Sequence, residues 1–247
     1  MRLRAFGNRR ASQLASAFVF TVLIAQSARA VPTPEDEYPA GPPARTGFQM
    51  ALRTGFSFPM GDATGIASDT LGRRYAWQVP VAIDLGAKIT RSIFIGTYFQ
   101  LGFGAEGSDT EVTALCDDND SDLSNDVSCS VLTARLGLLA NYQFAPDRTV
   151  NPWLGYGIGF ESATQSLNDR EHGYSESNTA SGFTYAQLAG GIDFRGAVGG
   201  GPYVELALGE FTRNRTSQYG RTASSGSIDD RALHAWLTLG VRFVVRP

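Results

Sequence analysis

Apolar and polar residues alternate with a period of two in eight separate segments after Gly47. This period is typical of β-strands whose two faces meet different surroundings. The sixth segment is irregular, because Phe183 and Tyr185 stand in the opposite register, and a bulge near Gly190–Gly191 would reconcile them. We therefore expect an all-β fold of eight antiparallel strands. The segments cover residues 48–58, 75–85, 93–103, 132–144, 154–160, 186–194, 204–208 and 233–243.

The two faces of these segments differ in composition. One face is apolar and carries no charged residue, whereas the other is polar and contains many glycines. A soluble barrel or sandwich would bury the apolar face, whereas an outer-membrane barrel turns it to the lipid and turns the polar face to its lumen. The charged residues of the polar face are four bases and four acids: Arg53, Lys88, Arg135, Arg242, Asp84, Glu161, Asp193 and Glu205.

Segment and connection lengths favour the membrane barrel. Most segments approach the roughly 9–11 residues of a tilted membrane strand, whereas soluble strands average about five or six. Short connections near 89–92, 145–151 and 196–201 alternate with long polar ones near 59–73, 105–130, 164–181 and 212–230. Short turns on one side and long loops on the other are typical of an up-and-down transmembrane β-barrel.

Aromatic residues gather at the ends of the segments rather than in their middles. Outer-membrane barrels carry such rings in two girdles at the membrane interfaces. We assign the following residues to the girdles: Phe48, Phe56, Phe58, Tyr75, Trp77, Tyr142, Phe144, Trp153 and Phe243.

The N-terminal segment has the features of an export signal. Arginines at the start precede an apolar stretch from Leu14 to Ala25, and Ala28-Arg29-Ala30 forms a small-x-small cleavage site. We expect a cleaved signal peptide over residues 1–30, a proline-rich periplasmic leader over 31–46 and the barrel over 47–247. The mature protein would then reside in the outer membrane of a Gram-negative bacterium.

The long connection over 105–130 contains both cysteines and most of the acidic motifs. Two cysteines in an exported protein predict a disulfide between Cys116 and Cys129. Three aspartates have the spacing of a calcium loop, but Leu123 stands where that loop needs glycine. We therefore expect a solvated acidic loop that associates loosely with divalent ions. The calcium candidates are Asp118, Asp120 and Asp122.

Composition and histidine content argue against other classes of function. The net charge of −3 gives no global electrostatic reason to bind nucleic acid. Charged residues make up 18% of the chain, which is low for a coiled coil or a charged disordered protein. The two histidines are His172, in a long connection near Ser175, and His234, on the polar face of the last segment. Because no orienting carboxylate is evident, we expect neither an enzyme nor a cofactor.

Two short motifs resemble those of a known group. Residues 151–160, with the sequence NPWLGYGIGF, resemble the proline, aromatic and alternating-glycine strand of small OmpA/OmpX-type outer-membrane barrels. Residues 239–243, LGVRF, are similar to the closing strand whose terminal aromatic residue the barrel-assembly machinery reads. Here four residues follow Phe243, whereas the aromatic residue usually ends the chain. The resemblance implies an eight-stranded barrel and contact with the assembly machinery.

Two functions from different classes remain open. An eight-stranded barrel holds little more than its own side chains, and its four bases and four acids should pair in a weakly screened lumen. The first hypothesis is thus a closed barrel, a monomer among outer-membrane lipids and lipopolysaccharide, which displays four extracellular loops in a structural or surface-interaction role. The alternative is a narrow channel or transporter for small or hydrophobic solutes, for which inward glycines such as Gly155, Gly157 and Gly159 leave space.

Overall fold

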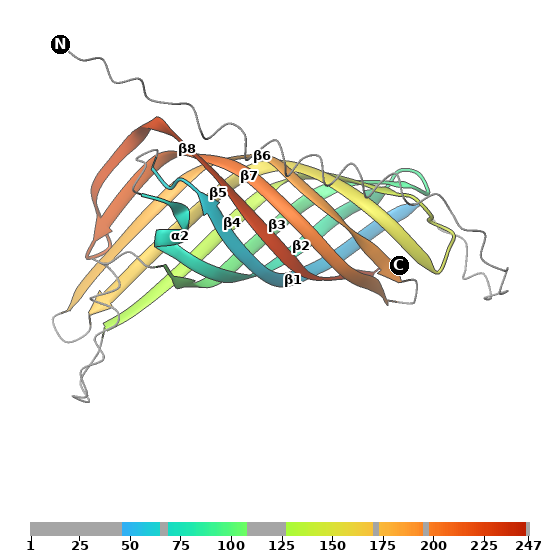
Figure 1. The fold of residues 1–247 in the computed structure, drawn as a ribbon, viewed down its shortest axis with the longest axis horizontal. Coiled ribbons are helices and arrows are strands. Elements are labelled where there is room, and N and C mark those ends of the chain that lie inside the picture. Colours follow the sequence, from blue (N-terminus) through green and yellow to red (C-terminus); the bar gives the residue numbers. More distant parts are fainter. Residues whose placement is uncertain (1–45, 65–68, 108–126, 170–172, 195–197, 246–247) are drawn as a thin grey trace, which may run out of the picture. The chain divides into compact units, whose positions relative to one another are not determined.

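A computed structural model describes residues 46–64, 69–107, 127–169, 173–194 and 198–245. Eight antiparallel strands form one closed barrel, in which each strand pairs with its sequence neighbours and the last pairs with the first (Figure 1). The predicted eight-stranded up-and-down topology is confirmed. The elements are β1 (Gly47–Gly61), α2 (Leu71–Arg74), β2 (Tyr75–Lys88), β3 (Ile93–Glu106), β4 (Val127–Gln143), β5 (Val150–Asp169), β6 (Tyr174–Phe194), β7 (Val198–Gln218) and β8 (Arg221–Val245).

Three sequence predictions concern segments outside the described residues. The signal peptide and all but the last residue of the leader precede residue 46. Cys129 lies in β4, but Cys116 falls between the described residues 107 and 127, as do the calcium candidates Asp118, Asp120 and Asp122. The cleaved signal, the disulfide and the assignment of a solvated acidic loop stay predictions.

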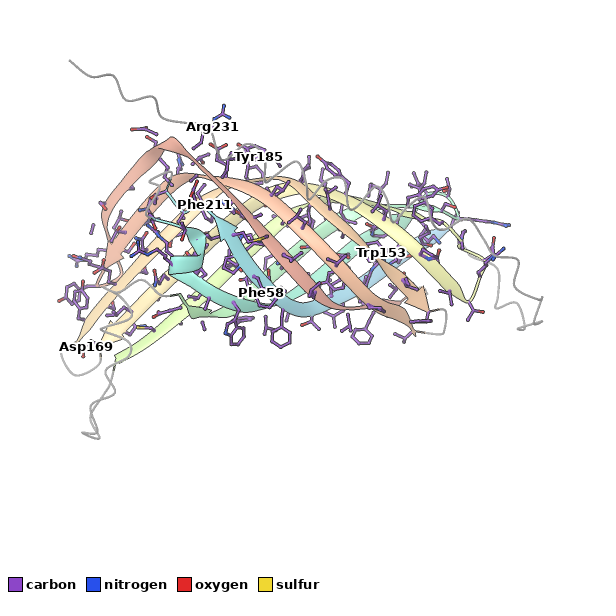
Figure 2. All side chains as sticks on the ribbon, in the orientation of Figure 1. Phe58, Trp153, Asp169, Tyr185, Phe211 and Arg231 are labelled. Carbon is purple, nitrogen blue, oxygen red and sulfur yellow. The ribbon has the colours of Figure 1, made fainter. Side chains whose placement is uncertain are left out.

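The wall of the barrel is apolar outside and polar inside. Along β1, Phe56 is 56% exposed, whereas its neighbour Ser57 is fully buried, because successive side chains of a strand point to opposite faces. The other strands repeat this pattern, and Figure 2 shows side chains projecting from the outside of the wall. In water this exposed apolar surface would be unfavourable, whereas in a bilayer it faces lipid. The fold is that of a transmembrane β-barrel.

Seven of the nine aromatic residues assigned to the girdles face outward, and two do not. Tyr75 is 2% exposed, because a bulge between Tyr75 and Trp77 shifts the register against β3 and turns Tyr75 inward. Trp153 is 4% exposed, because it has the opposite parity to the outward Leu154. The girdle assignments of Tyr75 and Trp153 are therefore wrong.

The irregular register of β6 comes from a bulge, but not at the predicted Gly190–Gly191, where pairing with β5 is regular. The extra residue lies at Tyr185, because the β5 partners of Thr184 and Gln187 are separated by only one residue. This bulge lets Phe183 and Tyr185 face outward together with the apolar residues that follow. The predicted existence of the bulge was right and its predicted position was wrong.

Strands β5 to β8 are much longer than the membrane requires. They have 20 to 25 residues, whereas β1, β2 and β3 have 14 or 15. About 9–11 tilted residues cross a bilayer, so β5 to β8 project beyond it at the end near α2 (Figure 1). Residues 164–181 and 212–230 were predicted to be long polar loops, and that prediction is wrong because most of them are strand. We call residues 164–169, 174–181, 212–218 and 221–231 the projecting sheet.

The hairpin between β7 and β8 closes with two residues. Tyr219 and Gly220 have φ values of 50° and 71°. Positive φ at both central residues is the geometry of a type I′ turn, whose twist matches that of the flanking strands. The projecting sheet therefore ends in a tight turn at this hairpin rather than in a loop.

A charge placed on the outward face tests the membrane assignment. Leu138 lies near the middle of the apolar face of β4 and is 59% exposed. Leu138→Arg should lower the free energy of unfolding in lipid vesicles by about 2–4 kcal/mol, measured by urea titration. Ser225→Arg on the projecting sheet is the control and should change it little. Equal stability of the two variants would contradict a lipid-facing wall.

Candidate functional site

The lumen is the first candidate site, because the charged residues predicted for the polar face of the strands lie there and not on the lipid-facing side. All eight charged residues predicted for the polar face point inward and are at most 5% exposed. Burial of a charge is unfavourable unless the charge is paired. Seven of them form the three ion-paired groups described below. Lys88 donates a hydrogen bond to the Gln143 side-chain oxygen at 2.7 Å.

The central cluster consists of Arg53, Asp84 and Glu205, from β1, β2 and β7. The Arg53 Nε donates to Oδ2 of Asp84 at 3.0 Å, and Nη2 donates to Oδ1 at 2.9 Å. Nη1 of the same guanidinium pairs with the Glu205 carboxylate. This arginine therefore links two acids on strands that are not neighbours of each other.

The histidine cluster consists of Arg135, Glu161 and His234, from β4, β5 and β8. The Arg135 Nε donates to Oε2 of Glu161 at 3.0 Å, and Nε2 of His234 contacts Oε1 of the same carboxylate. The Phe211 ring stacks on the imidazole, with ring centroids 4.1 Å apart. Glu161 thus joins β4 and β8 across the lumen, and His234 is held on two sides.

The third group lies at the short-turn end of the barrel. Arg242 of β8 donates from Nη1 to Oδ2 of Asp193 on β6 at 3.3 Å. The guanidinium carbon of Arg242 lies 4.3 Å from the centre of the Trp153 ring. The inward position of Trp153 therefore stabilises the buried cation through its π-face.

Aromatic partners for the other arginines were missed in the sequence. The Tyr203 ring centre lies 5.8 Å from the guanidinium carbon of Arg53, and the Trp236 ring centre lies 5.2 Å from that of Arg135. Both rings are buried. The sequence could have predicted their inward position, because residues two positions apart on a strand share a face. Tyr203 lies two residues from the inward Glu205, and Trp236 lies two residues from the inward His234.

An apolar cluster fills the lumen at the end near α2. Leu71 of α2 is fully buried in it, and Ile228 of the projecting sheet packs against it. The segment before α2 is held by Asp69, which accepts hydrogen bonds from Arg74 at 2.8 and 2.6 Å. No helix of the described part of the chain is long and apolar enough to cross a membrane. The cluster consists of Ala63, Leu71, Tyr75, Val131, Ala163, Ala180, Ala207, Phe211, Ala232 and Trp236.

Little open space remains beside the inward glycines of β5. A cavity next to Arg53, Asp84, Gly155 and Gly157 has a volume of about 10 Å³, roughly that of one water molecule. The side chain of Gln187 fills much of the space that Gly157 leaves, since its Oε1 would lie 3.1 Å from a Cβ built there. The glycines at 155 and 157 thus accommodate neighbouring side chains, those of Asn141 and Gln187.

Metal-ligating side chains do not gather into a site among the described residues. No group of three His, Cys, Asp or Glu side chains in them could hold a metal ion. His172 lies outside them, so its pairing with Ser175 stays untested. His234 contacts Glu161 inside the wall. Ion pairs across the lumen connect strands that are not neighbours in the sheet.

Comparisons with known proteins found solved structures at low identity and with TM-scores below 0.5. No protein-family model and no curated protein matches the sequence. Neisserial surface protein A is 11% identical over 82% of this chain and 99% of that protein, with a TM-score of 0.42. A major outer membrane protein from Thermus thermophilus is 11% identical over 81% and 99%, with a TM-score of 0.48. Ail, the attachment invasion locus protein of Yersinia pestis, is 9% identical over 80% and 98%, with a TM-score of 0.41. The assignment as a small eight-stranded transmembrane barrel rests on the strand pairing itself.

Removal of the shared acid tests the histidine cluster. Glu161→Gln leaves Arg135 without its carboxylate partner in a buried site, so the free energy of unfolding should fall by about 3–5 kcal/mol. Urea titration of the protein refolded into vesicles measures it. Glu176→Gln on the projecting sheet is the matched control, with an expected change below about 1 kcal/mol. A loss at residue 161 no larger than that of the control would contradict the pairing.

Acid should loosen the segment around α2. Partial burial raises the pKa of Asp69, but hydrogen bonds from Arg74 and Thr64 outweigh it and lower that pKa below its usual value. A lowered folded pKa stabilises above the unfolded pKa of about 3.9, and this is lost as the pH falls through the folded pKa. Hydrogen exchange of residues 69–74, corrected for intrinsic rates, should accelerate below about pH 4. Asp69→Asn should exchange faster already at pH 7, and identical pH profiles would contradict this role.

Proposed function

We propose that the protein is a closed outer-membrane barrel that acts at the cell surface through its projecting sheet, in a structural or interaction role and not as an enzyme. The observation that carries the proposal is the filled lumen. Ion-paired side chains bridge it at the central, histidine and short-turn groups, and the apolar cluster fills its end near α2. Because the interior is occupied by the protein's own side chains, recognition falls to the surface outside the membrane.

The projecting sheet has a strand edge available for contacts. Pairing of β8 with β1 ends at His234 with Gly61, so β8 from Arg221 to Ala232 has no strand partner on that side among the described residues. Thr222 to Ser227 on this edge are exposed. An uncovered edge can pair with an extended segment of another protein. This supports an interaction role, and we propose that the partner is a protein at the cell surface.

Orientation and assembly follow from the same architecture. The short turns and both ends of the strand array, Gly47 and Val245, lie at one end of the barrel, which we assign to the periplasm. Lipopolysaccharide would then surround the opposite end. Phe243 is outward and near the end of β8, where the barrel-assembly machinery would read it. We expect a cleaved signal peptide, a monomer and a disulfide between Cys116 and Cys129.

Conductance separates the closed barrel from the alternative of a narrow channel. The purified protein, shown to be folded by a gel mobility that changes on boiling, should give no steady ion current in planar bilayers. Liposomes that contain it should not swell in small sugars. Steady current or swelling would overturn the closed-lumen proposal and favour transport.

Surface labelling tests the assignment of the projecting sheet. Ser225→Cys in intact cells should react with a maleimide that does not cross the outer membrane, because residue 225 is exposed on the sheet. The unsubstituted chain gives the background from its own cysteines. Labelling at background level in intact cells, with full labelling after lysis, would place the sheet on the periplasmic side and contradict the proposal.

A further inference from the structure

The outer face of β4 to β7 changes from apolar to hydroxyl-bearing over a few residues. The register aligns Leu136, Phe160 and Phe183 in one row, and the Phe160 and Phe183 rings lie 4.5 Å apart. The next row toward the projecting sheet has small side chains, and the row after it has threonines. We call these the aromatic, small and threonine rows. The small row is Ala134, Ser162 and Ser181, and the threonine row continues from Leu132 through Thr164 to Thr179.

A groove lies over the small row. Its volume is about 490 Å³. Phe160 and Phe183 line its apolar side, and Ser162, Ser181 and Thr212 line its polar side. The groove exists because short side chains stand between rows of longer ones. It therefore spans the boundary at which the apolar wall ends.

Two arginines end the polar rows. Arg213 pairs with Ser181, and Arg215 pairs with Thr179, so both share the outward face of these residues. A bulge at Thr212, where β7 has one residue more than β6 between Phe211 and Arg213, sets this direction. Arg213 is exposed and lines the groove. Arg215 is exposed and hydrogen-bonds the Thr222 hydroxyl.

We infer that this groove binds the phosphorylated head of lipid A, the lipid anchor of lipopolysaccharide, and we call it the lipid A groove. Guanidinium groups bind phosphate through paired, charge-assisted hydrogen bonds. Serine and threonine hydroxyls suit the sugar hydroxyls and amides of a glucosamine head, while the aromatic row receives an acyl chain. The inference rests on the proposed outer-membrane location and on the proposed orientation with the projecting sheet at the cell surface, but not on the closed lumen.

Two acids, Glu161 and Glu210, lie near the groove, and both have partners. Glu161 lines the groove together with Arg135, but both are buried on the lumen side, where Arg135 donates a hydrogen bond to Glu161 at 3.0 Å. The small and threonine rows of β4 to β7 contain no acidic residue. Glu210 faces the same side and pairs with Phe183 in the aromatic row, but it does not line the groove. Its carboxylate accepts a hydrogen bond from the Tyr185 hydroxyl at 2.5 Å. Arg213 therefore makes the polar end of the groove positive, and Arg215 adds a second charge one row beyond it, opposite Thr179.

Native mass spectrometry of the full chain in detergent micelles tests the lipid A groove. The probe is diphosphoryl lipid A, compared with dephosphorylated lipid A, phosphatidylglycerol and inorganic phosphate. Arg213→Gln/Arg215→Gln should retain diphosphoryl lipid A about tenfold more weakly, because charge-assisted hydrogen bonds are lost. Arg221→Gln, an exposed arginine near the turn of the same hairpin, removes one charge outside the groove and should bind normally.

A second variant tests shape without changing charge. Ser181→Phe fills the groove floor with a ring that the surrounding lipid tolerates, so it should fold, as a mobility shift on boiling would show, yet bind lipid A weakly. Full binding by the double arginine variant, or an equal loss in Arg221→Gln, would overturn the inference. So would equal retention of dephosphorylated lipid A or of phosphatidylglycerol. If the protein gives no ion current in planar bilayers and also binds no lipid A, the proposed closed barrel stands and only the inferred lipid A site is overturned.

Discussion

Closure of the sheet is the constraint on which the rest of the structure depends. Within a bilayer no water can satisfy an unpaired backbone N–H or C=O group, so a strand can cross only if both edges are paired. The pairing of β1 with β8, from Met50 with Val245 to Gly61 with His234, removes the last edge within the membrane. Once that edge is paired, the outer face of the wall can be mostly apolar and can face lipid.

The same closure forces the charged residues into a narrow interior, where they stabilise the fold only as pairs. The central and histidine clusters connect strands that are not neighbours, such as β1 with β7 and β5 with β8. Aromatic rings cover the guanidinium groups at all three levels. The interior thus contains ion pairs that connect different parts of the barrel wall across the lumen. The free edge of β8 and the groove over the small row lie outside this interior.

Prediction from the sequence succeeded where one face met lipid and failed where it did not. Period-two alternation identified eight strands because lipid contact demands apolar residues at every second position. It missed the projecting parts of β5 to β8, since no lipid demands apolar residues on the outer face there and residues 174–181 show no apolar period. It also misplaced Tyr75, because a single extra residue at a bulge reverses parity without any change in composition.

The sequence by itself determined the two-faced wall, the number of strands and the set of buried charges, because each follows from alternation along a single segment. It did not determine which acid pairs with which base. Arg53 and Glu205 are 152 positions apart, and only the register of the closed barrel brings them together. Tertiary structure alone decided these pairs, the inward place of Trp153 over Arg242, and the row that joins Ser162, Ser181 and Arg213. Each is a contact between strands, and strand register is set by the whole sheet rather than by any one segment.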